Sequence, residues 1–251
     1  MTIIIKNEEE INTMRQGGQI LGKLLEALIN KANPGTCVYD LDQFAEKFIK
    51  DHSALPSFKG YQGFPGTICT AINSGIVHGI PKKEDILKKG DLFTIDCGVY
   101  FEGLHTDAAR SCIVGGKGPN NRHELLKTAE KALNAATAVA ISGNRVSDIS
   151  KAIQSIVENK GYHVIRDLTG HGVGKKLHEA PIINNYFDGN EGAKLTPGMT
   201  LAIEPIFAVG TDKMITQKDN WTLVTADDSD AIQVENTILI TKTGNETLTK
   251  A

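Results

Sequence analysis

The sequence is poor in cysteine, balanced in charge and free of long apolar runs, and each of these absences excludes a class of protein. Its four cysteines lie far apart and form no Cys-x-x-Cys pair, so neither a disulfide framework nor a zinc finger is expected. Lysine and arginine number 27 against 30 aspartates and glutamates, a net charge of −3. This balance lacks the basic signature of nucleic-acid binding, and we expect no recognition of nucleic-acid sequence.

The apolar segments are too short for a membrane protein. The longest, around residues 135–141, falls far below the roughly 20 residues that a membrane helix needs. The first ten residues lack the basic start and the long apolar core of a signal peptide. The scattered cysteines fit a reducing compartment. We therefore expect a soluble cytoplasmic protein without a membrane partner.

The hydrophobic pattern predicts a protein of mixed helix and strand. Helical spacing and β-rich runs succeed one another with no segment of linker composition, which predicts one compact α+β domain. Glu102-Gly103 stands between two β-rich runs and predicts a hairpin turn. The expected helices cover residues 8–30, 41–49, 122–141 and 148–159, and the expected strands cover 67–71, 92–96, 110–114, 199–203, 221–225 and 232–240.

The chain repeats a pattern at an offset of 108 residues. Residues 87–96 and 195–204 both read Leu-x-x-Gly-x-x-apolar-x-Ile-acid, and residues 35–41 match residues 143–149 at the same offset. A strand entered through a glycine turn is common in composition, yet two blocks that share one offset favour a duplication. We therefore expect a helix-pair-plus-strand unit present twice. Each copy ends a strand on a carboxylate, and pseudo-symmetric halves would bring the two acids toward a common centre.

Four acids end or interrupt apolar strands: Asp96, Asp107, Glu204 and Glu235. A carboxylate in an apolar strand is costly unless it is paired or binds a metal ion. One such acid is usually a surface residue, and Asp96 and Asp107 alone could form the surface of a hairpin. A shared cation explains all four together.

Two histidines, His171 and His178, lie seven residues apart in the glycine-rich segment Gly-His-Gly-Val-Gly-Lys-Lys-Leu-His-Glu. Glycines let a backbone approach a ligand closely or adopt a positive φ. One histidine and the four acids make an oxygen-rich set that suits Mn²⁺, Fe²⁺ or Co²⁺ and tolerates Zn²⁺. Such a set also fits two ions bridged by carboxylates. A further histidine, His78, stands in Ile-Val-His-Gly-Ile-Pro. On its sequence context alone it could be a core residue whose ring nitrogens are hydrogen-bonded.

The order of these residues resembles that of type I methionine aminopeptidases, which have the pita-bread fold. The candidates run Asp, a second Asp eleven residues on, His-Gly-x-Gly, Ile-Glu-Pro and Glu-x-Thr. The resemblance implies pseudo-twofold duplicated units, each a helix pair with an antiparallel sheet, around a central dinuclear metal site. It implies a single catalytic domain over residues 1–251, of the minimal bacterial form. Other matching segments lie at residues 60–65, 67–73, 78–81, 178–181, 194–199 and 219–221.

The resemblance also implies the metal ligands. Asp107 and Glu235 would bridge two divalent ions. Asp96 would complete one site, and His171 with Glu204 would complete the other. The ions could be cobalt, manganese, iron or zinc.

The reaction implied by the resemblance is removal of the initiator methionine from nascent proteins whose second residue is small. Metal-bound hydroxide attacks the first peptide bond, Glu204 shuttles the proton, and His178 stabilises the intermediate. His78 contacts the scissile amide, and the free α-amine of the substrate sits at the ion held by Asp96. The pocket for the methionine side chain, beside His78 and His178, is formed by Phe58, Tyr61, Phe64, Cys69, Leu177 and Trp221.

Several positions depart from the family pattern. Gln62 stands where some members have histidine, Ala108 where many have threonine or serine, and Asn236 where many have histidine. Leu177 and Phe58 differ from the pocket residues of some members. These departures bear on metal preference, rate and selectivity, and they leave the reaction class unchanged.

The partner implied by the resemblance is the N-terminal methionine of nascent polypeptides, with transient proximity to the ribosome and a monomeric protein. Two other readings remain. One is a pita-bread enzyme that acts on Xaa-Pro bonds, which usually carries a large N-terminal domain. The other is a non-catalytic pita-bread protein used for binding, which typically loses ligands. All five ligand positions are present here, which favours the aminopeptidase.

Overall fold

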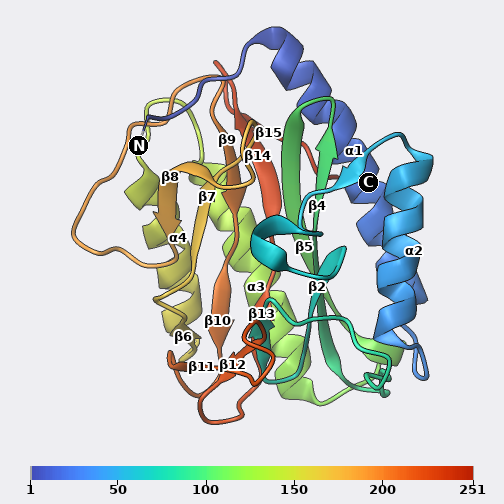
Figure 1. Ribbon diagram of the computed structural model, residues 1–251. Coiled ribbons are helices and arrows are strands. Elements are labelled where there is room, and N and C mark those ends of the chain that lie inside the picture. The colour runs from blue at the N-terminus through green and yellow to red at the C-terminus, as the bar shows by residue number, and fades with distance from the viewer. Residues whose placement is uncertain (1, 251) are drawn as a thin grey trace.

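The computed structural model describes residues 2–250, which form two helix pairs, each followed along the chain by a run of strands (Figure 1). The helices are α1 (Glu8–Lys31), α2 (Val38–Asp51), α3 (Asn120–Val139) and α4 (Val146–Glu158), and 3₁₀ turns lie at Tyr61–Gly63 and Val114–Gly116. The first strands are β1 (Leu55–Pro56), β2 (Ile68–Ile72), β3 (Gly75–Val77), β4 (Leu92–Phe101) and β5 (Leu104–Ile113). The later strands are β6 (His163–Val164), β7 (Thr169–Gly172), β8 (Glu179–Asn184), β9 (Thr200–Ile203), β10 (Ile206–Ala208), β11 (Met214–Thr216), β12 (Leu223–Thr225), β13 (Ala231–Gln233), β14 (Asn236–Ile240) and β15 (Asn245–Thr247).

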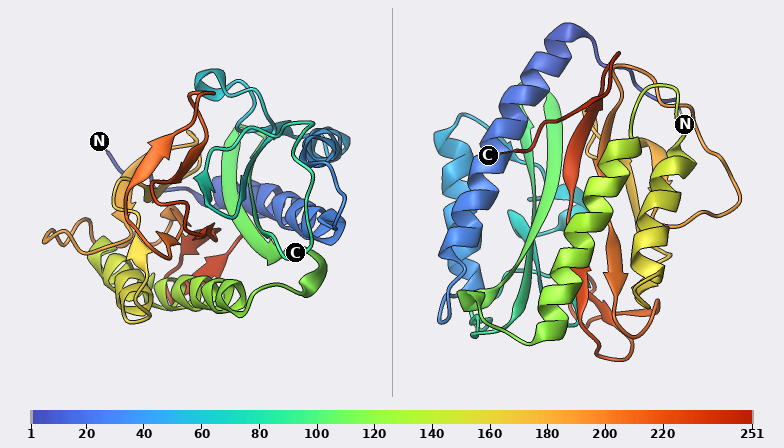
Figure 2. Two further views of the ribbon diagram at one scale, coloured as in Figure 1. Left: turned by 90° about the horizontal axis from the view of Figure 1, so that it is seen from below. Right: turned by 180° about the vertical axis from the view of Figure 1, so that it is seen from behind.

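Two antiparallel sheets form the inner layer of the molecule. In the first, β4 pairs with β1, β2 and β5, and the second has the order β15-β14-β9-β7-β8. The helices pack on the back of these sheets. Figure 2 shows α2, α1, α3 and α4 across that back face, so each half of the chain contributes one helix pair and one sheet.

The two sheets meet where β5 lies beside β14. The Asp107 amide donates to Thr237 Oγ1 at 2.9 Å, and Thr237 Oγ1 donates to the Asp107 carbonyl at 2.8 Å. The Glu235 amide donates to the Ala109 carbonyl at 3.0 Å. Residues from both halves of the chain therefore lie next to one another at this seam, where their side chains can form one site.

Helix α1 runs unbroken through two glycines that weaken its middle in the sequence. A capping box starts the helix: the Asn7 side chain accepts from the Glu10 amide, and the Glu10 carboxylate accepts from the Asn7 amide, both at 2.9 Å. A Cβ on Gly18 would lie 2.4 Å from the Leu248 carbonyl oxygen, so glycine permits the close approach of the C-terminal segment. Within residues 2–250, no helix has both the length and the apolar character required to cross a membrane.

The predicted duplication is confirmed by backbone contacts that recur 108 residues apart. The Val38 amide donates to the Asp85 carbonyl at 2.9 Å, and the Val146 amide donates to the Ala193 carbonyl at 3.0 Å. The same offset relates the hydrogen bonds Gly35–Leu87 and Gly143–Leu195 and the bridges Cys37–Ile86 and Arg145–Lys194. Each helix pair covers its own buried core, so the two halves are built alike.

The strand predicted over residues 232–240 is wrong in one respect, because it is interrupted. Its two parts, β13 and β14, belong to different sheets, and Glu235 lies at the break. Glu204 lies at a similar break between β9 and β10. The predicted hairpin at Glu102-Gly103 is confirmed as the turn between β4 and β5. Both breaks free an acidic side chain from the regular alternation of a strand.

Candidate metal centre and substrate pocket

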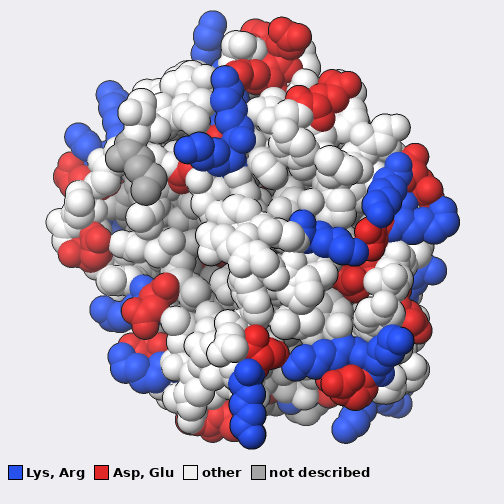
Figure 3. Space-filling model, viewed as in Figure 1, with Lys and Arg blue, Asp and Glu red and all other residues white. Residues whose placement is uncertain are grey.

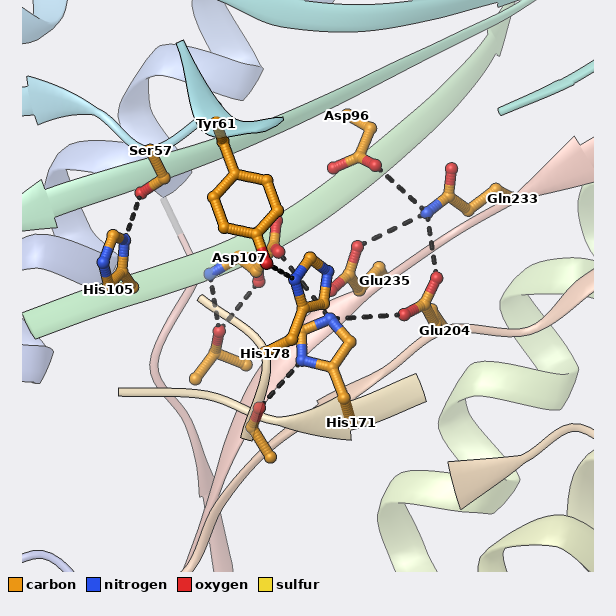
Figure 4. A network of polar contacts seen from close by, with 12 residues as sticks. Ser57, Tyr61, Asp96, His105, Asp107, His171, His178, Glu204, Gln233 and Glu235 are labelled. Carbon is orange, nitrogen blue, oxygen red and sulfur yellow. Dashed lines mark hydrogen bonds and ion pairs between the residues drawn. The ribbon is translucent and has the colours of Figure 1, made fainter. Parts of the chain in front are cut away.

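The five predicted ligand residues line one cavity of about 780 Å³. Asp96 on β4 and Asp107 on β5 face the same side of their sheet, since Asp107 pairs with Gly98, two residues from Asp96. His171 lies on β7, and Glu204 and Glu235 lie at the two strand breaks. Figure 4 shows all five side chains directed toward one another. Asp107 is buried and Asp96 faces the cavity, which excludes a simple hairpin surface for this pair.

These side chains are close enough for one cation to contact several of them. Ligand atoms of Asp107, His171 and Glu235 all lie within 4.8 Å of one another. His171 Nε2 lies 3.6 Å from Glu204 Oε1 and 3.9 Å from Asp107 Oδ2. The cluster therefore combines donors from both halves of the duplicated fold.

Gln233 also belongs to this cluster, although it was not among the residues predicted from the sequence. Its Nε2 lies 3.3 Å from Asp96 Oδ2, 3.3 Å from Glu204 Oε2 and 3.5 Å from Glu235 Oε2 (Figure 4). An amide NH₂ has two hydrogens, so it cannot satisfy three carboxylates at once. The available signal was its position two residues before Glu235 in Ala-Ile-Gln-Val-Glu.

The four acids are difficult to ionise together without a cation. Burial raises the pKa of Asp96 to about 7, and burial with neighbouring carboxylates raises the pKa of Asp107, Glu204 and Glu235 well above its usual range. Among residues 2–250, three carboxylate oxygens are buried and have no hydrogen-bond partner: Asp96 Oδ1, Asp107 Oδ1 and Glu235 Oε1. Such atoms are costly unless a cation pairs with them, so these residues fit a metal centre.

His171 presents its nitrogen in the form that a metal ion requires. Its Nδ1 lies 2.8 Å from the Gly172 carbonyl, which can only accept, so Nδ1 carries the hydrogen and Nε2 keeps its lone pair. Burial lowers the pKa of His171 to about 3, which keeps the ring neutral. A Cβ on Gly172 would lie 2.2 Å from the Ala180 carbonyl oxygen, so this glycine permits the close packing of β7 against β8.

Two more histidines line the cavity beside the ligand cluster. The exposed His178 ring lies edge-on to His171 at 4.4 Å between centroids, and His178 Nδ1 lies 3.0 Å from the Tyr61 hydroxyl. His78 also faces the cavity, which excludes the alternative of a core histidine. Partial removal from water lowers the pKa of both His78 and His178. Both rings are therefore neutral at neutral pH.

An apolar pocket adjoins the ligand cluster within the same cavity. The Phe64 and Trp221 rings lie edge-on, with 5.2 Å between their centroids. Tyr61 also lines the cavity, and 37% of its surface is exposed to solvent. All six residues predicted for the pocket line this cavity: Phe58, Tyr61, Phe64, Cys69, Leu177 and Trp221. Ile80 packs against the same cluster and was not expected. The structure thus places an apolar slot directly beside a group of buried acids.

Comparison with known proteins identifies the family. The model of the metallopeptidase family M24 matches residues 12–242. The chain belongs to this family. A methionine aminopeptidase of Clostridium acetobutylicum is 47% identical over 98% of both chains, and methionine aminopeptidase 1 of Bacillus subtilis is 44% identical over 99% of both.

Solved structures of M24 metallopeptidases have the same fold. The crystal structure of a methionine aminopeptidase from Thermotoga maritima matches with a TM-score of 0.97 and 39% identity, over 100% of both chains. A prolidase from Pyrococcus furiosus matches with a TM-score of 0.79 and 26% identity, over 99% of this chain and 66% of the prolidase. The predicted pita-bread fold is therefore confirmed. As an M24 metallopeptidase the protein uses divalent metal, and the buried acids with His171 are suited to hold it.

The departures from the family pattern occupy different places in this metallopeptidase. Asn236 Oδ1 accepts from Arg110 Nη2 at 2.8 Å, and Arg110 Nη1 donates to the Glu235 carbonyl at 2.6 Å, so Asn236 helps to fix the backbone of Glu235. The Ala108 side chain is fully buried in the core beneath α1 and α2, on the opposite side of β5 from the Asp107 side chain. Gln62 lines the cavity.

Proposed function

We propose that this M24 metallopeptidase is a methionine aminopeptidase that removes the N-terminal methionine when the second residue is small. The observation that carries the proposal is an apolar pocket beside five convergent metal-ligand candidates, in a chain 47% identical to a named methionine aminopeptidase. We further propose that residues 1–251 act as a single catalytic domain. The two cores that meet at one central site support this assignment.

In this proposal, two divalent ions are held by Asp96, Asp107, His171, Glu204 and Glu235. Asp107 and Glu235 would contribute to holding both ions, Asp96 would contribute to one, and His171 with Glu204 would contribute to the other. The support is that three buried carboxylate oxygens, which could each bind a metal ion, have no hydrogen-bond partner among residues 2–250. Cobalt, manganese, iron and zinc all suit this donor set. When bound, such ions polarise a carbonyl and lower the pKa of water.

Glu204 is proposed to move a proton from water to the leaving amine. The Glu204 carboxylate faces the cavity, where it can exchange a proton with a substrate. Gln233 Nε2, 3.3 Å from Glu204 Oε2, orients the carboxylate. Glu204 can therefore hold a proton at the centre of the cavity and release it there.

His178 is proposed to donate a hydrogen bond to the carbonyl oxygen as negative charge develops on it. When the Tyr61 hydroxyl donates to His178 Nδ1, the neutral ring carries its hydrogen on Nε2. A fixed donor of this kind stabilises the transition state more than the ground state. His78, on the same cavity, is proposed to contact the scissile amide, and the substrate α-amine is proposed to lie near Asp96.

The apolar pocket is proposed to select methionine. Its walls are Phe58, Phe64, Cys69 and Leu177, with Trp221 packed against them. A thioether is flexible and polarisable, and sulfur–aromatic contacts add about 0.3–1.5 kcal/mol. An apolar pocket discriminates by about 1–3 kcal/mol per methylene, so close isosteres of methionine should be weak substrates.

We propose that the enzyme acts in the cytoplasm on nascent polypeptides, as a monomer that meets the ribosome transiently. The support is chemical, since an N-terminal methionine is first exposed as a chain leaves the ribosome. Figure 3 shows charged side chains of both signs spread over one face, with a largely uncharged middle, so any contact there is weakly electrostatic. Cosedimentation with translating ribosomes tests the contact, and light scattering tests the monomer.

A second candidate activity is cleavage of Xaa-Pro bonds. The likeness to a prolidase of Pyrococcus furiosus, with a TM-score of 0.79, favours it. This chain covers only 66% of that prolidase, whereas it covers 98% of the Clostridium acetobutylicum methionine aminopeptidase. The methionine aminopeptidase is therefore the better supported of the two.

The proposal is tested by hydrolysis of Met-Ala-Ser. Metal-stripped protein is reconstituted separately with Mn²⁺, Fe²⁺, Co²⁺ and Zn²⁺, and released methionine is measured. Leu-Ala-Ser, an Xaa-Pro dipeptide and the Glu204→Gln variant serve as controls. Metal-dependent release of methionine, weak release of leucine and loss of turnover in Glu204→Gln are expected. Turnover of the Xaa-Pro dipeptide alone would establish the second candidate instead.

A further inference from the structure

A buried ion pair joins the N-terminal segment to the loop that carries His178. Lys6 Nζ lies 2.5 Å from Glu179 Oε2, and the two side chains are only 1% and 2% exposed. Burial lowers the pKa of Lys6, which shows how far the pair is removed from water. An apolar pair of similar size often stabilises a core as well or better. Stability alone therefore does not account for this pair, and its neighbours indicate what it holds in place.

Glu179 fixes both ends of a short segment of the loop between β7 and β8. Its Oε1 accepts from the Lys176 amide at 2.9 Å, and its Oε2 accepts from Lys6. Between these anchors, Leu177 contributes to the apolar pocket and His178 reaches the cavity. One carboxylate thus holds the segment that presents both side chains to a substrate.

Lys6 is itself held firmly by the second sheet. Its amide donates to the Gly198 carbonyl at 2.9 Å, and the Gly198 amide donates to the Ile240 carbonyl at 2.9 Å. Gly198 lies two residues before β9, and Glu204 directly follows the last residue of that strand. A series of hydrogen bonds therefore connects the segment before β9 to Lys6, and Lys6 to Glu179. Through these contacts the position of His178 depends on the strand that leads to Glu204.

We propose that Lys6 is a positioning residue for His178, acting through Glu179. This inference rests on the proposed function, in which His178 donates to the developing oxyanion. Without the ammonium group, Glu179 keeps one amide donor and has an uncompensated buried charge, which favours rotation of the carboxylate toward the cavity that it lines. The adjoining His178 then moves with the backbone. A displacement of about 1 Å at a reacting group can lower the rate about 10²-fold.

A matched control is present on the surface of the same two segments. Lys175 Nζ lies 2.7 Å from Glu10 Oε1, with side chains 52% and 19% exposed. This pair also ties the loop to the N-terminal segment, but it contacts neither Glu179 nor His178 through the hydrogen bonds of the described residues. Exposed ion pairs contribute little, so Lys175→Met should leave the loop in place.

The test is a double-mutant cycle on metal-reconstituted protein. We would measure kcat and KM for Met-Ala-Ser in the wild type, Lys6→Met, His178→Ala, the double variant and Lys175→Met. Lys6→Met is expected to lower kcat by about 10–10²-fold with a smaller change in KM, and to cause no further loss when His178 is already alanine. Lys175→Met is expected to match the wild type. Equal losses of kcat in both His178 backgrounds would overturn the proposal.

A second variant and an NMR measurement test the same proposal independently of the Lys6→Met kinetics. If Lys6→Met does not fold, Glu179→Ala takes its place in the cycle, because it removes the carboxylate that joins Lys6 to the Lys176 amide. The imidazole NMR signals of His178, assigned by their absence in His178→Ala, report the ring position without any turnover. A shift in Lys6→Met but not in Lys175→Met is expected, and unchanged His178 signals in Lys6→Met would refute the positioning role. An inactive wild type would instead refute the proposed function, while the NMR result still decides the positioning role.

Discussion

Removal of metal is expected to make the free energy of unfolding fall as the pH rises from about 4 to about 7. The reason is the group of buried acids in the central cavity. Burial raises the pKa of Asp96 from 3.8 to about 7. A carboxyl with a raised folded pKa binds more protons in the folded state than in the unfolded state. Its stabilising protonation is complete below the unfolded pKa and is lost as the pH rises through the folded pKa.

The size of this effect follows from the shift. For Asp96 alone, (7 − 3.8) multiplied by 1.36 kcal/mol is about 4 kcal/mol. Asp107, Glu204 and Glu235 have their pKa values raised in the same direction, so the site as a whole disfavours ionisation. A whole domain is stable by only about 5–15 kcal/mol, so the effect is measurable. Divalent ions replace the protons, and at a hundredfold excess over Kd they add about 2.7 kcal/mol.

The assay is urea unfolding at several pH values between about 5 and about 7, with a chelator or with saturating Mn²⁺. The chelated protein should lose stability as the pH rises, and Mn²⁺ should stabilise more at the higher pH because the ligands must lose their protons. Asp96→Asn removes one titrating group and should give a shallower slope. If the free energy of unfolding of the chelated wild type were constant or increased with pH, the buried acids could not have raised pKa values.

Three further predictions concern catalysis, selectivity and packing. Glu204→Gln should lower kcat for Met-Ala-Ser by about 10²–10⁴-fold, measured as methionine release; near-normal turnover would remove the proton-transfer role. Trp221→Ala deletes the edge-on partner of Phe64 and widens the pocket. The ratio of kcat/KM for Met-Ala-Ser over Leu-Ala-Ser should therefore fall about tenfold, and an unchanged ratio would contradict the assigned wall. Gly18→Ala places a methyl group against the Leu248 carbonyl and should lower the free energy of unfolding by about 1–3 kcal/mol in urea titrations. A neutral effect would show that α1 can move away at no cost.

The sequence predicted the ligand candidates well because their chemistry conflicts with their surroundings. Asp107 and Glu235 stand in segments whose sequence predicts a largely apolar strand, where an acid needs a partner, and the structure brings both into one buried cluster. Gln233 was not predicted, because an uncharged amide is not unusual in a strand and gives no reason to expect a binding partner. Its contacts with three acids depend on how β13 meets the cavity, which is a property of the fold.

The fold was predictable where the pattern is long and local. The helix expected over residues 8–30 is Glu8–Lys31, and the repeat at an offset of 108 reappears as paired backbone hydrogen bonds. Short strands such as β6 and β11 were missed, since two or three residues carry no usable periodicity. The break at Glu235 was missed because residues 232–240 keep the β-rich composition of a single strand on both sides of it. Only the pairing of its two parts with different sheets separates them.

The activity proposed for this metallopeptidase is the removal of methionine from proteins with a small second residue. It is tested most directly by intact-mass measurement on two folded reporter proteins that begin Met-Ala and Met-Leu, incubated with the metal-reconstituted enzyme. We expect the loss of one methionine from the Met-Ala protein, no loss from the Met-Leu protein, and no reaction with Glu204→Gln. An unchanged Met-Ala protein, or removal that continues past the first residue, would contradict it.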